Sequence, residues 1–280
     1  MIPDYKTNLL CLSDILPKNY PNFYQQFEKV LKDCGINFKL LSPTNDIWAV
    51  DYMPVQIDIN KFVQFVYKPS YLKTRAELNT ISNVDAICKQ LGIETIRLNI
   101  LLDGGNVIRA TDKIIMTERI FYENSTYKRE NLMKELQNYF EVEKIFIIPE
   151  QPNDFTGHAD GMVRFIDDKT VLINNYKSEG KKFRDSFEIT IRKTGLNYIK
   201  IPYNPYNNDD EDQANGCYIN YLQMENVVII PTFGIKEDDV VVKQFEEIFK
   251  GQTIATINCH DIAKNGGVLN CITWNIRAEK

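Results

Sequence analysis

Histidine is scarce in this 280-residue sequence, which holds only His158 and His260. Any chemistry that needs an imidazole therefore has two candidates. Long apolar runs are also lacking, since no stretch approaches the roughly 18 residues that a membrane-spanning helix requires. The first residues, M-I-P-D-Y-K-T, do not combine a basic segment with an apolar one, as a secretion signal would. We therefore expect a cytoplasmic protein with no membrane partner.

The sequence also lacks paired cysteines and an excess of positive charge. Its six cysteines are scattered without a C-x-x-C pair, which disfavours a zinc knuckle or a thioredoxin-type motif. A formal net charge of −5 and a pI near 5.3 would repel a phosphate backbone, so we expect no nucleic-acid partner. The same acidic balance suits a small cationic ligand. A scattered cysteine is usually a small buried apolar residue, and one of the six needs a different interpretation.

The residues that are present predict an α/β protein of one domain, residues 1–280. A hydrophobic share of 44% and a charged share of 25% are typical of a folded chain rather than a disordered one. β-Branched and aromatic runs alternate with segments of helical apolar spacing. The predicted strands are 62–67, 95–101, 113–117, 145–149, 162–166, 170–175, 198–202, 227–231 and 253–258. The predicted helices are 22–34, 76–91, 129–140, 181–193 and 238–249.

Glycine-containing turns recur along the chain at similar intervals. From Gly105 to Gly157 is 52 residues, from Gly157 to Gly216 is 59, and from Gly216 to Gly267 is 51. This spacing indicates about five strand–helix units, and a closed ring of them would bring equivalent turns together at one central mouth. Strand–helix proteins can also space turns at similar intervals by chance, which is the alternative.

His158 is the stronger of the two histidine candidates. It lies in D-F-T-G-H-A-D-G-M-V-R-F, two residues before Asp160, and residues two apart on an extended segment point to the same face. We therefore expect His158 and Asp160 to face one pocket, anchored by the apolar strand that follows. His260, at the end of an apolar run, is expected to be structural.

Cys271 is the candidate nucleophile. It lies in N-G-G-V-L-N-C-I-T-W, close to Gly266 and Gly267, which permit an unusual backbone. A cysteine acts as a nucleophile at neutral pH only with a lowered pKa or a nearby base. His158 could be that base only if the fold brings two units together.

Aspartates complete the pattern. Asp51 lies in W-A-V-D-Y-M-P and Asp160 in H-A-D-G. Two carboxylates that converge on one pocket without metal-ligand companions favour a cationic ligand, and a guanidinium can take bidentate hydrogen bonds from both. Asp51 could instead be a surface turn residue, and Asp103 with Gly104 and Gly105 could be a plain turn.

Five segments together resemble the agmatine deiminase and bacterial peptidylarginine deiminase-like family of guanidino-group-modifying enzymes. They follow one another in the family's order over nearly the whole chain. They read I-W-A-V-D-Y-M-P-V at 47–55, L-D-G-G-N at 102–106, G-H-A-D-G-M-V-R-F at 157–165, Y-I-N-Y-L at 218–222 with V-V-I-I-P-T-F-G at 227–234, and G-G-V-L-N-C-I-T at 266–273.

The resemblance implies a pentein fold, a five-bladed α/β propeller, and a cysteine-dependent hydrolysis that needs no metal or organic cofactor. Cys271 would attack the guanidinium carbon, and His158 would protonate the departing ammonia and then activate water. That role suits a histidine that titrates near neutrality. Asp51 and Asp160 would bind the guanidinium nitrogens. The remaining expected substrate-binding residues, all within the matching blocks, are Asp103, Trp48, Gly105, Asn106 and Arg164.

Three departures from the family pattern leave the substrate open. Val50 replaces the arginine of W-x-R-D, Asp103 replaces the glutamate of E-G-G-N, and Asn270 replaces the histidine before the cysteine. Agmatine would imply polyamine (putrescine) synthesis. The alternatives are arginine or peptidylarginine deimination, amidino transfer to an amine, and a non-catalytic guanidine-binding protein. The acidic run 207–213 could attract a cationic tail or be a solvated loop, and assembly into a homo-oligomer stays open.

Overall fold

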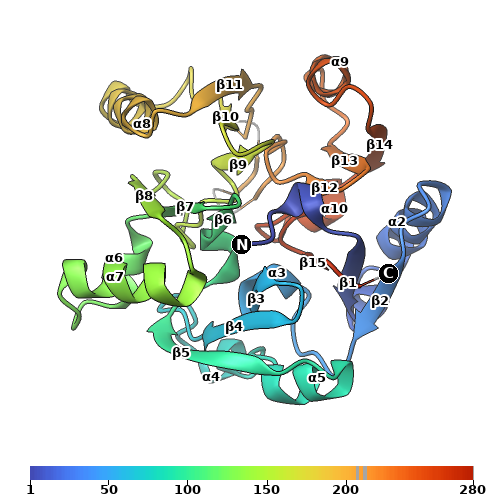
Figure 1. The fold of residues 1–280 in the computed structure, drawn as a ribbon. Helices are drawn as coiled ribbons and strands as arrows, with labels where there is room; N and C mark the ends of the chain where they lie inside the picture. The colour runs from blue at the N-terminus through green and yellow to red at the C-terminus, as the bar shows by residue number, and fades with distance from the viewer. Residues whose placement is uncertain (206–207, 211–212, 280) are drawn as a thin grey trace.

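The computed structural model describes residues 1–205, 208–210 and 213–279. Its strands form five separate three-stranded sheets, which are arranged around a common centre (Figure 1). In order along the chain, the strands are β1 (Leu9–Ser13), β2 (Phe38–Leu41), β3 (Val55–Asp58), β4 (Lys61–Val66), β5 (Thr95–Leu101), β6 (Ile108–Arg109), β7 (Lys113–Thr117), β8 (Lys144–Ile148), β9 (Val163–Phe165), β10 (Thr170–Asn174), β11 (Asn197–Ile201), β12 (Leu222–Met224), β13 (Val227–Thr232), β14 (Thr253–Asn258) and β15 (Thr273–Ile276).

All five sheets share one topology. The middle strand pairs antiparallel with the inner strand and parallel with the outer strand, as in β3–β4–β5. The sheet orders are β15-β1-β2, β3-β4-β5, β6-β7-β8, β9-β10-β11 and β12-β13-β14. The first sheet joins the two ends of the chain, because β1 pairs with β15. The five predicted units are thereby confirmed, and they form the pentein fold.

The main helices lie at the periphery of the ring (Figure 1). They connect the middle and outer strands, as a parallel pair requires. These crossover helices are α1 (Leu16–Asn19), α2 (Pro21–Asp33), α4 (Arg75–Leu78), α5 (Val84–Leu91), α6 (Arg119–Glu123), α7 (Arg129–Phe140), α8 (Lys181–Lys193) and α9 (Asp238–Ile248). Short helices lie in the remaining segments: η1 (Asp4–Lys6), α3 (Ala49–Tyr52), η2 (Gly104–Asn106) and α10 (His260–Ala263).

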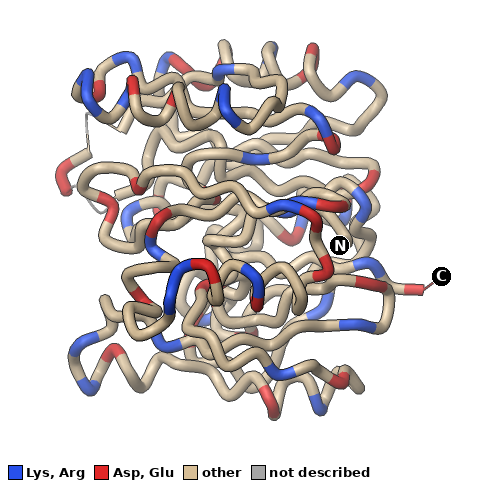
Figure 2. The backbone as a smooth tube through the Cα atoms, turned by 60° about the vertical axis from the view of Figure 1, so that its left-hand side comes forward, with Lys and Arg blue, Asp and Glu red and all other residues tan. Residues whose placement is uncertain are grey.

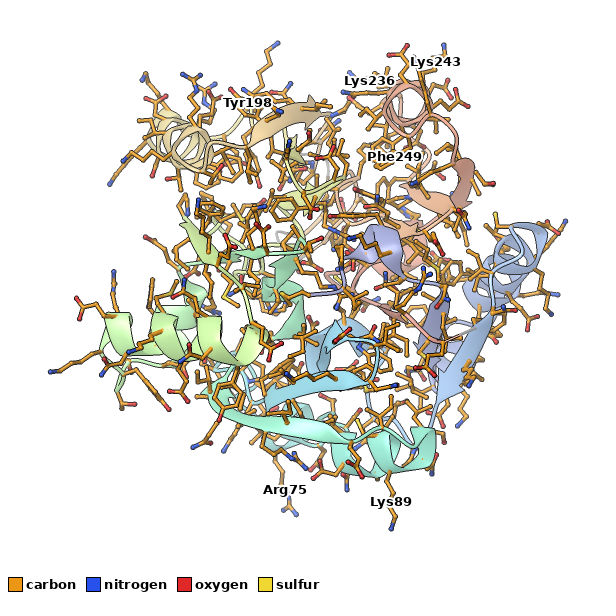
Figure 3. All side chains as sticks on the ribbon, viewed as in Figure 1. Arg75, Lys89, Tyr198, Lys236, Lys243 and Phe249 are labelled. Atoms are coloured by element: carbon orange, nitrogen blue, oxygen red, sulfur yellow. The ribbon has the colours of Figure 1, made fainter. Side chains whose placement is uncertain are left out.

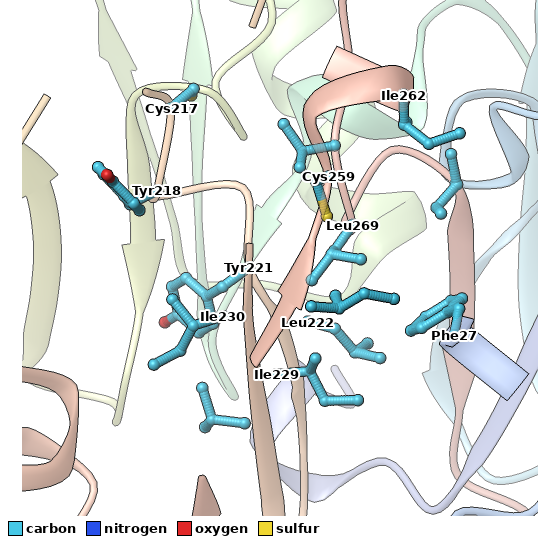
Figure 4. Packing of buried hydrophobic residues seen from close by; sticks show 14 of the residues in the cluster. Phe27, Cys217, Tyr218, Tyr221, Leu222, Ile229, Ile230, Cys259, Ile262 and Leu269 are labelled. Carbon is cyan, nitrogen blue, oxygen red and sulfur yellow. The ribbon is translucent and has the colours of Figure 1, made fainter. Parts of the chain in front are cut away.

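Each long helix buries one apolar stripe, and α2 packs against β14 of the neighbouring sheet. In α2, Phe23, Phe27 and Leu31 are buried at four-residue spacing, which places them on one face. Phe27 packs in the cluster that also contains Tyr221, Leu222 and Ile229 (Figure 4). Long cationic side chains such as Lys89 and Lys243 project outward from the rim (Figure 3). Charges of both signs are spread along the outer segments (Figure 2).

The predicted helix 76–91 is wrong in one respect, because it is two helices. α4 ends at Leu78 and α5 begins at Val84. The side chain of Asn83 accepts a hydrogen bond from the backbone N–H of Ala86 and so caps a new helix. In the part of the chain that the structure describes, no helix combines the length and the apolar character needed to cross a bilayer.

Candidate active site

Five connections join the outer strand of each unit to the inner strand of the next. Four of them line one cavity, and the fifth, β5–β6, lies behind its wall. The cavity has a volume of about 700 Å³. Its wall includes Trp48 and Asp51 from the β2–β3 connection, His158 and Asp160 from β8–β9, and Cys271 from β14–β15. The predicted convergence of residues from distant units is therefore observed.

His158 is held between two carboxylates. Its Nε2 lies 2.7 Å from Oδ2 of Asp103, and its Nδ1 lies 3.5 Å from Oδ1 of Asp51. The side chain of His158 is 5% exposed. Burial lowers the pKa of His158, but Asp51, Asp103 and Asp160 together raise it to about 10. The carboxylates around His158 therefore favour its imidazolium form, whereas the sequence predicted a histidine that titrates near neutrality.

Asp51 and the glycine turn pack against His158. The backbone N–H of Gly105 donates to Oδ1 of Asp51 over 3.0 Å. A Cβ at Gly105 would lie 2.6 Å from both this oxygen and Nδ1 of His158, so only glycine permits the approach. Burial, with nearby Asp160 and Asp103, raises the pKa of Asp51 although His158 opposes the shift.

Asp160 and Cys271 form the second half of the site. Sγ of Cys271 lies 3.4 Å from Oδ2 of Asp160, as expected for a thiol that donates to a carboxylate. Burial and the charges of Asp160 and Asp51 raise the pKa of the Cys271 thiol well above its ordinary value. The surrounding carboxylates thus favour the protonated thiol of Cys271.

His158 and Asp160 both line the cavity, but the prediction that they share one face of an extended segment is wrong. Residue 159 lies in a bend and residues 160–162 form a turn, so His158 and Asp160 are not on one strand. Asp160 is positioned by its backbone N–H, which donates to the carbonyl of Gly105 over 3.0 Å, and the next turn closes from Met162 to Ala159. β9 begins only at Val163.

Arg164 does not reach the cavity. Its guanidinium donates to Oδ2 of Asp4 and to the carbonyl of Tyr221, and it stacks over the Tyr221 ring. Arg164 is not among the residues that line the cavity. We therefore withdraw Arg164 as a substrate-binding residue.

Three further predicted residues stand behind the wall. Asp103 contacts His158, and Gly105 contacts Asp51. Asn106 is buried, and its Oδ1 accepts hydrogen bonds from the backbone and the hydroxyl of Thr117. These three residues support the site from behind, and the structure gives none of them as lining the cavity.

Sequence reasoning missed two tyrosines and one asparagine. Tyr71 lines the cavity, donates to Oδ2 of Asp103 over 3.1 Å and packs edge-on against His158. Tyr67 lines the same wall. Asn220 contacts Cys271 and Asp160. The Y-I-N-Y-L block contained Asn220, and the repeat spacing could have indicated that the fourth connection supplies a residue too.

The outer part of the cavity is acidic. Its lining carboxylates beyond the reaction centre are Asp46, Asp154, Glu77, Glu179, Asp209 and Asp210. None of the lining residues that the structure describes is lysine or arginine. Of the predicted acidic run 207–213, Asn208 to Asp210 and Gln213 lie on the wall, whereas residues 207, 211 and 212 lie outside the described residues.

His260 lies apart from the reaction centre, as expected. Its Nδ1 is 3.0 Å from Oδ1 of Asn215. Among residues 1–205, 208–210 and 213–279, no group of three or more histidine, cysteine, aspartate or glutamate side chains is arranged to hold a metal ion.

Comparison with known proteins places this chain in a family. Residues 12–276 match the family model of the Porphyromonas-type peptidyl-arginine deiminases. A provisionally named agmatine deiminase of Mycoplasma mycoides is 24% identical over 223 residues, which is 67% of this chain and 60% of the relative. The chain thus spans about three-fifths of the length of that relative.

Solved structures agree in fold. The agmatine deiminase of C. jejuni superposes with a TM-score of 0.82 at 17% identity, covering 100% of this chain and 96% of the other. The agmatine deiminase of Enterococcus faecalis gives 0.72 at 18% identity, covering 99% and 95%. With the family model matching nearly the whole sequence, the chain belongs to the Porphyromonas-type peptidyl-arginine deiminase family.

Proposed function

We propose that this protein is a cysteine hydrolase that deiminates agmatine to its carbamoyl product and ammonia. The observation that carries the proposal is the convergence of Cys271, His158, Asp51 and Asp160 on one cavity that has acidic outer walls. Membership of the family supports the same reaction class. The names of its similar structures support agmatine in particular.

Binding would begin with the guanidinium between Asp51 and Asp160. Charge-assisted hydrogen bonds to both carboxylates would fix its plane beside Sγ of Cys271. The positive charge of the substrate would offset the carboxylates that keep Cys271 protonated. Substrate entry would therefore favour release of the thiol proton to solvent, which leaves the thiolate beside the guanidinium carbon.

The chemistry would proceed in two steps. The sulfur electron pair attacks the guanidinium carbon, and the C–N bond breaks as the nitrogen takes a proton from the His158 imidazolium and leaves as ammonia. The resulting amidino-thioether is attacked by a water that neutral His158 deprotonates. The C–S bond then breaks, the carbamoyl product leaves and Cys271 regains its thiol.

The acidic outer wall favours agmatine over arginine. Agmatine ends in an ammonium group, for which the outer carboxylates are complementary, whereas the α-carboxylate of arginine would meet like charges. No lysine or arginine among the described lining residues offsets them, and the sequence has none between Lys200 and Lys236. Peptidylarginine deimination and amidino transfer are the competing reactions. Hydrolysis and transfer differ in whether water or an amine enters the cavity after ammonia leaves.

The six cysteines are all free in the described chain, which supports a reducing compartment, and we propose the cytoplasm. The proposed partner is a small guanidino compound.

Ammonia release from agmatine, arginine, a blocked arginyl peptide and dimethylarginine tests the proposal, with Cys271→Ala as control. We expect release from agmatine that the variant abolishes, together with a carbamoyl product. A new guanidino product would indicate amidino transfer. Saturable agmatine binding without any turnover would indicate a non-catalytic guanidine-binding protein.

A further inference from the structure

Tyr71 reaches the reaction centre from a crossover rather than from a connection between units. It lies in the segment between β4 and α4, within the unit of the β3–β4–β5 sheet. Its side chain lines the cavity, and its hydroxyl donates to Oδ2 of Asp103 over 3.1 Å. Nε2 of His158 lies 2.7 Å from the same oxygen. The hydroxyl and the imidazole therefore share one carboxylate oxygen.

Contacts on two sides hold Tyr71 in this position. The preceding Ser70 donates from its backbone N–H and from its hydroxyl to the carboxylate of Glu123, over 3.1 and 2.7 Å. The Tyr71 ring packs edge-on against Phe155, with 5.4 Å between the ring centroids. The carbonyl of Phe155 accepts a hydrogen bond from Arg119. Because Arg119 and Glu123 both belong to α6, one helix anchors the two segments that hold the ring.

The Tyr71 hydroxyl is a lasting donor to this carboxylate. Burial and the nearby charge of Asp103 raise the pKa of Tyr71 well above its ordinary value, so the hydroxyl keeps its proton at neutral pH. A carboxylate that already accepts one hydrogen bond attracts a further proton less strongly. The hydroxyl therefore weakens the hold of Asp103 on the proton that His158 directs at the same oxygen.

The other groups around His158 increase the need for such a counterweight. Carboxylates face it from three connections, Asp51 from β2–β3, Asp103 from β5–β6 and Asp160 from its own, and all three favour the imidazolium. The Tyr71 ring packs edge-on against the imidazole from the β4–α4 segment. An imidazolium that is held too firmly is a poor proton donor, because proton transfer is most efficient when the pKa lies near the working pH.

We propose that Tyr71 is a positioning residue that acts through Asp103, where its hydroxyl orients the carboxylate toward Nε2 of His158 and eases release of the imidazolium proton to the substrate. This rests on the proposed function only in giving His158 the proton transfers. Removing the hydroxyl alone isolates the effect, since a phenylalanine keeps the ring that packs against Phe155 and His158.

NMR titration of His158 in the ligand-free protein tests the proposal without any turnover, with His260→Gln used to assign the two imidazoles. We expect Tyr71→Phe to raise the His158 midpoint by at least about 0.5 pH unit, which lowers the neutral fraction at pH 9 about threefold. Tyr5→Phe is the matched control. Tyr5 donates to Oδ1 of Asp168 over 2.7 Å and is not among the described residues that line the cavity. Its loss should move the midpoint by less than about 0.2 unit.

Asp103→Asn supplies the test that the hydroxyl acts through the carboxylate. Without the charge of Asp103, Tyr71→Phe should move the His158 midpoint by less than about 0.2 unit, because the two changes are then coupled rather than additive. A midpoint that Tyr71→Phe leaves unchanged or lowers in the presence of Asp103 would overturn the proposal. Equal shifts with and without Asp103 would also overturn it, by assigning the effect to direct contact between the ring and His158.

Steady-state ammonia release separates positioning from substrate binding. In Tyr71→Phe we expect kcat to fall about tenfold with KM changed less than about twofold, because the hydroxyl serves proton transfer rather than the substrate. A raised KM at unchanged kcat would overturn the proposal in favour of a substrate contact. Thermal unfolding establishes that each variant is folded. Failure of the proposed function would appear separately, as a wild type that releases no ammonia while the titrations follow the expected pattern.

Discussion

At the residue scale, Gly105 decides how closely the groups around His158 can approach. Its missing side chain leaves room for Asp51 and the imidazole, each of which would lie 2.6 Å from an added Cβ. We expect Gly105→Ala to lower kcat/KM for the guanidino substrate about 100-fold, since a displacement near 1 Å costs about that much. Gly180→Ala is the control, because its Cβ would meet no atom within 4 Å. Wild-type ammonia release in Gly105→Ala would contradict the argument.

His158 is open to direct titration because the chain has only one other histidine. In NMR, with His260→Gln used to assign the two imidazoles, we expect His158 to stay protonated through neutral pH and to titrate toward about pH 10. Its pKa is raised above the unfolded value of about 6.5. Its contribution to stability is therefore fully present below that pH and lost as the pH rises toward 10.

A bound cation should reverse part of that shift. In Cys271→Ala, saturation with agmatine should lower the His158 midpoint, because the guanidinium competes for Asp51 and Asp160. A midpoint near 6.5 in the ligand-free protein, or one that agmatine leaves in place, would refute this electrostatic description.

The sequence motifs located some site residues better than others. Cys271, His158, Asp51 and Asp160 stand in distinctive blocks, and their convergence followed from the repeat. Arg164 lies in the same sequence block as His158, but its side chain pairs with Asp4 rather than lining the cavity. A single sequence does not reveal an ion pair between residues 160 positions apart.

At the element scale, α9 is held at its N-terminus by one carboxylate. Asp238 accepts hydrogen bonds from the backbone N–H groups of Phe233, Gly234 and Ile235 and from the hydroxyl of buried Tyr218. We expect Asp238→Ala to lower the free energy of unfolding by roughly 1–3 kcal/mol, because it leaves these donors unsatisfied. Urea unfolding measures the loss.

The adjacent Asp239 is the natural comparison for Asp238. It is exposed and shares the first turn of α9, so it has the same proximity to the helix dipole. Asp239→Ala should change stability by well under about 1 kcal/mol. Equal losses in the two variants would assign the effect to the dipole rather than to the Asp238 hydrogen bonds.

The elements themselves were predictable where their apolar pattern is long. Helices such as α2 and α7 carry buried stripes at four-residue spacing, and the sequence predicted both within one residue. The short inner strands β6 and β12 were not predicted, because two or three residues carry little periodic signal. The three-residue β9 was predicted, because apolar residues at 162–166 mark it. β15 was missed for a different reason. It completes the first sheet by pairing with β1, and the first residue of β1, Leu9, lies 264 positions before Thr273, the first residue of β15.

At the scale of the whole molecule, the ring is closed at both ends of the chain. Besides the β1–β15 pairing, Nε1 of Trp274 donates to the carbonyl of Pro54, and the N-terminus lies at the centre of the ring (Figure 1). Because the two ends of the chain form one sheet, removing either end should disrupt the closure of the ring. That residues 1–280 fold as one domain stays a prediction.

Asp4 joins three of the five units at the centre. Its Oδ1 accepts from Nη2 of Arg109 over 2.8 Å and lies 3.5 Å from Nδ2 of Asn275, and its Oδ2 accepts from Nη2 of Arg164. The side chain of Arg164 is 2% exposed and that of Arg109 10%. Two buried cations therefore depend on one carboxylate from the N-terminal segment.

Replacing this carboxylate should destabilise the whole ring. We expect Asp4→Asn to cost roughly 3–5 kcal/mol at pH 7, because it leaves two buried cations without their counter-charge. Asp85→Asn is the matched control, since its ion pair with Arg97 is more than half exposed and should be worth under about 1 kcal/mol. Urea unfolding of both variants gives the comparison, and equal losses would show that Asp4 acts no differently from a surface charge.

The same variant should change the acid limb of the stability curve. Burial raises the pKa of Asp4, but Arg109 and Arg164 outweigh burial and lower it below its ordinary value near 4. Its contribution is thus present above the unfolded pKa and lost as the pH falls through the folded one. The difference in unfolding free energy between wild type and Asp4→Asn should shrink below pH 4, and a difference that stays constant to pH 2.5 would show that packing rather than charge makes Asp4 important.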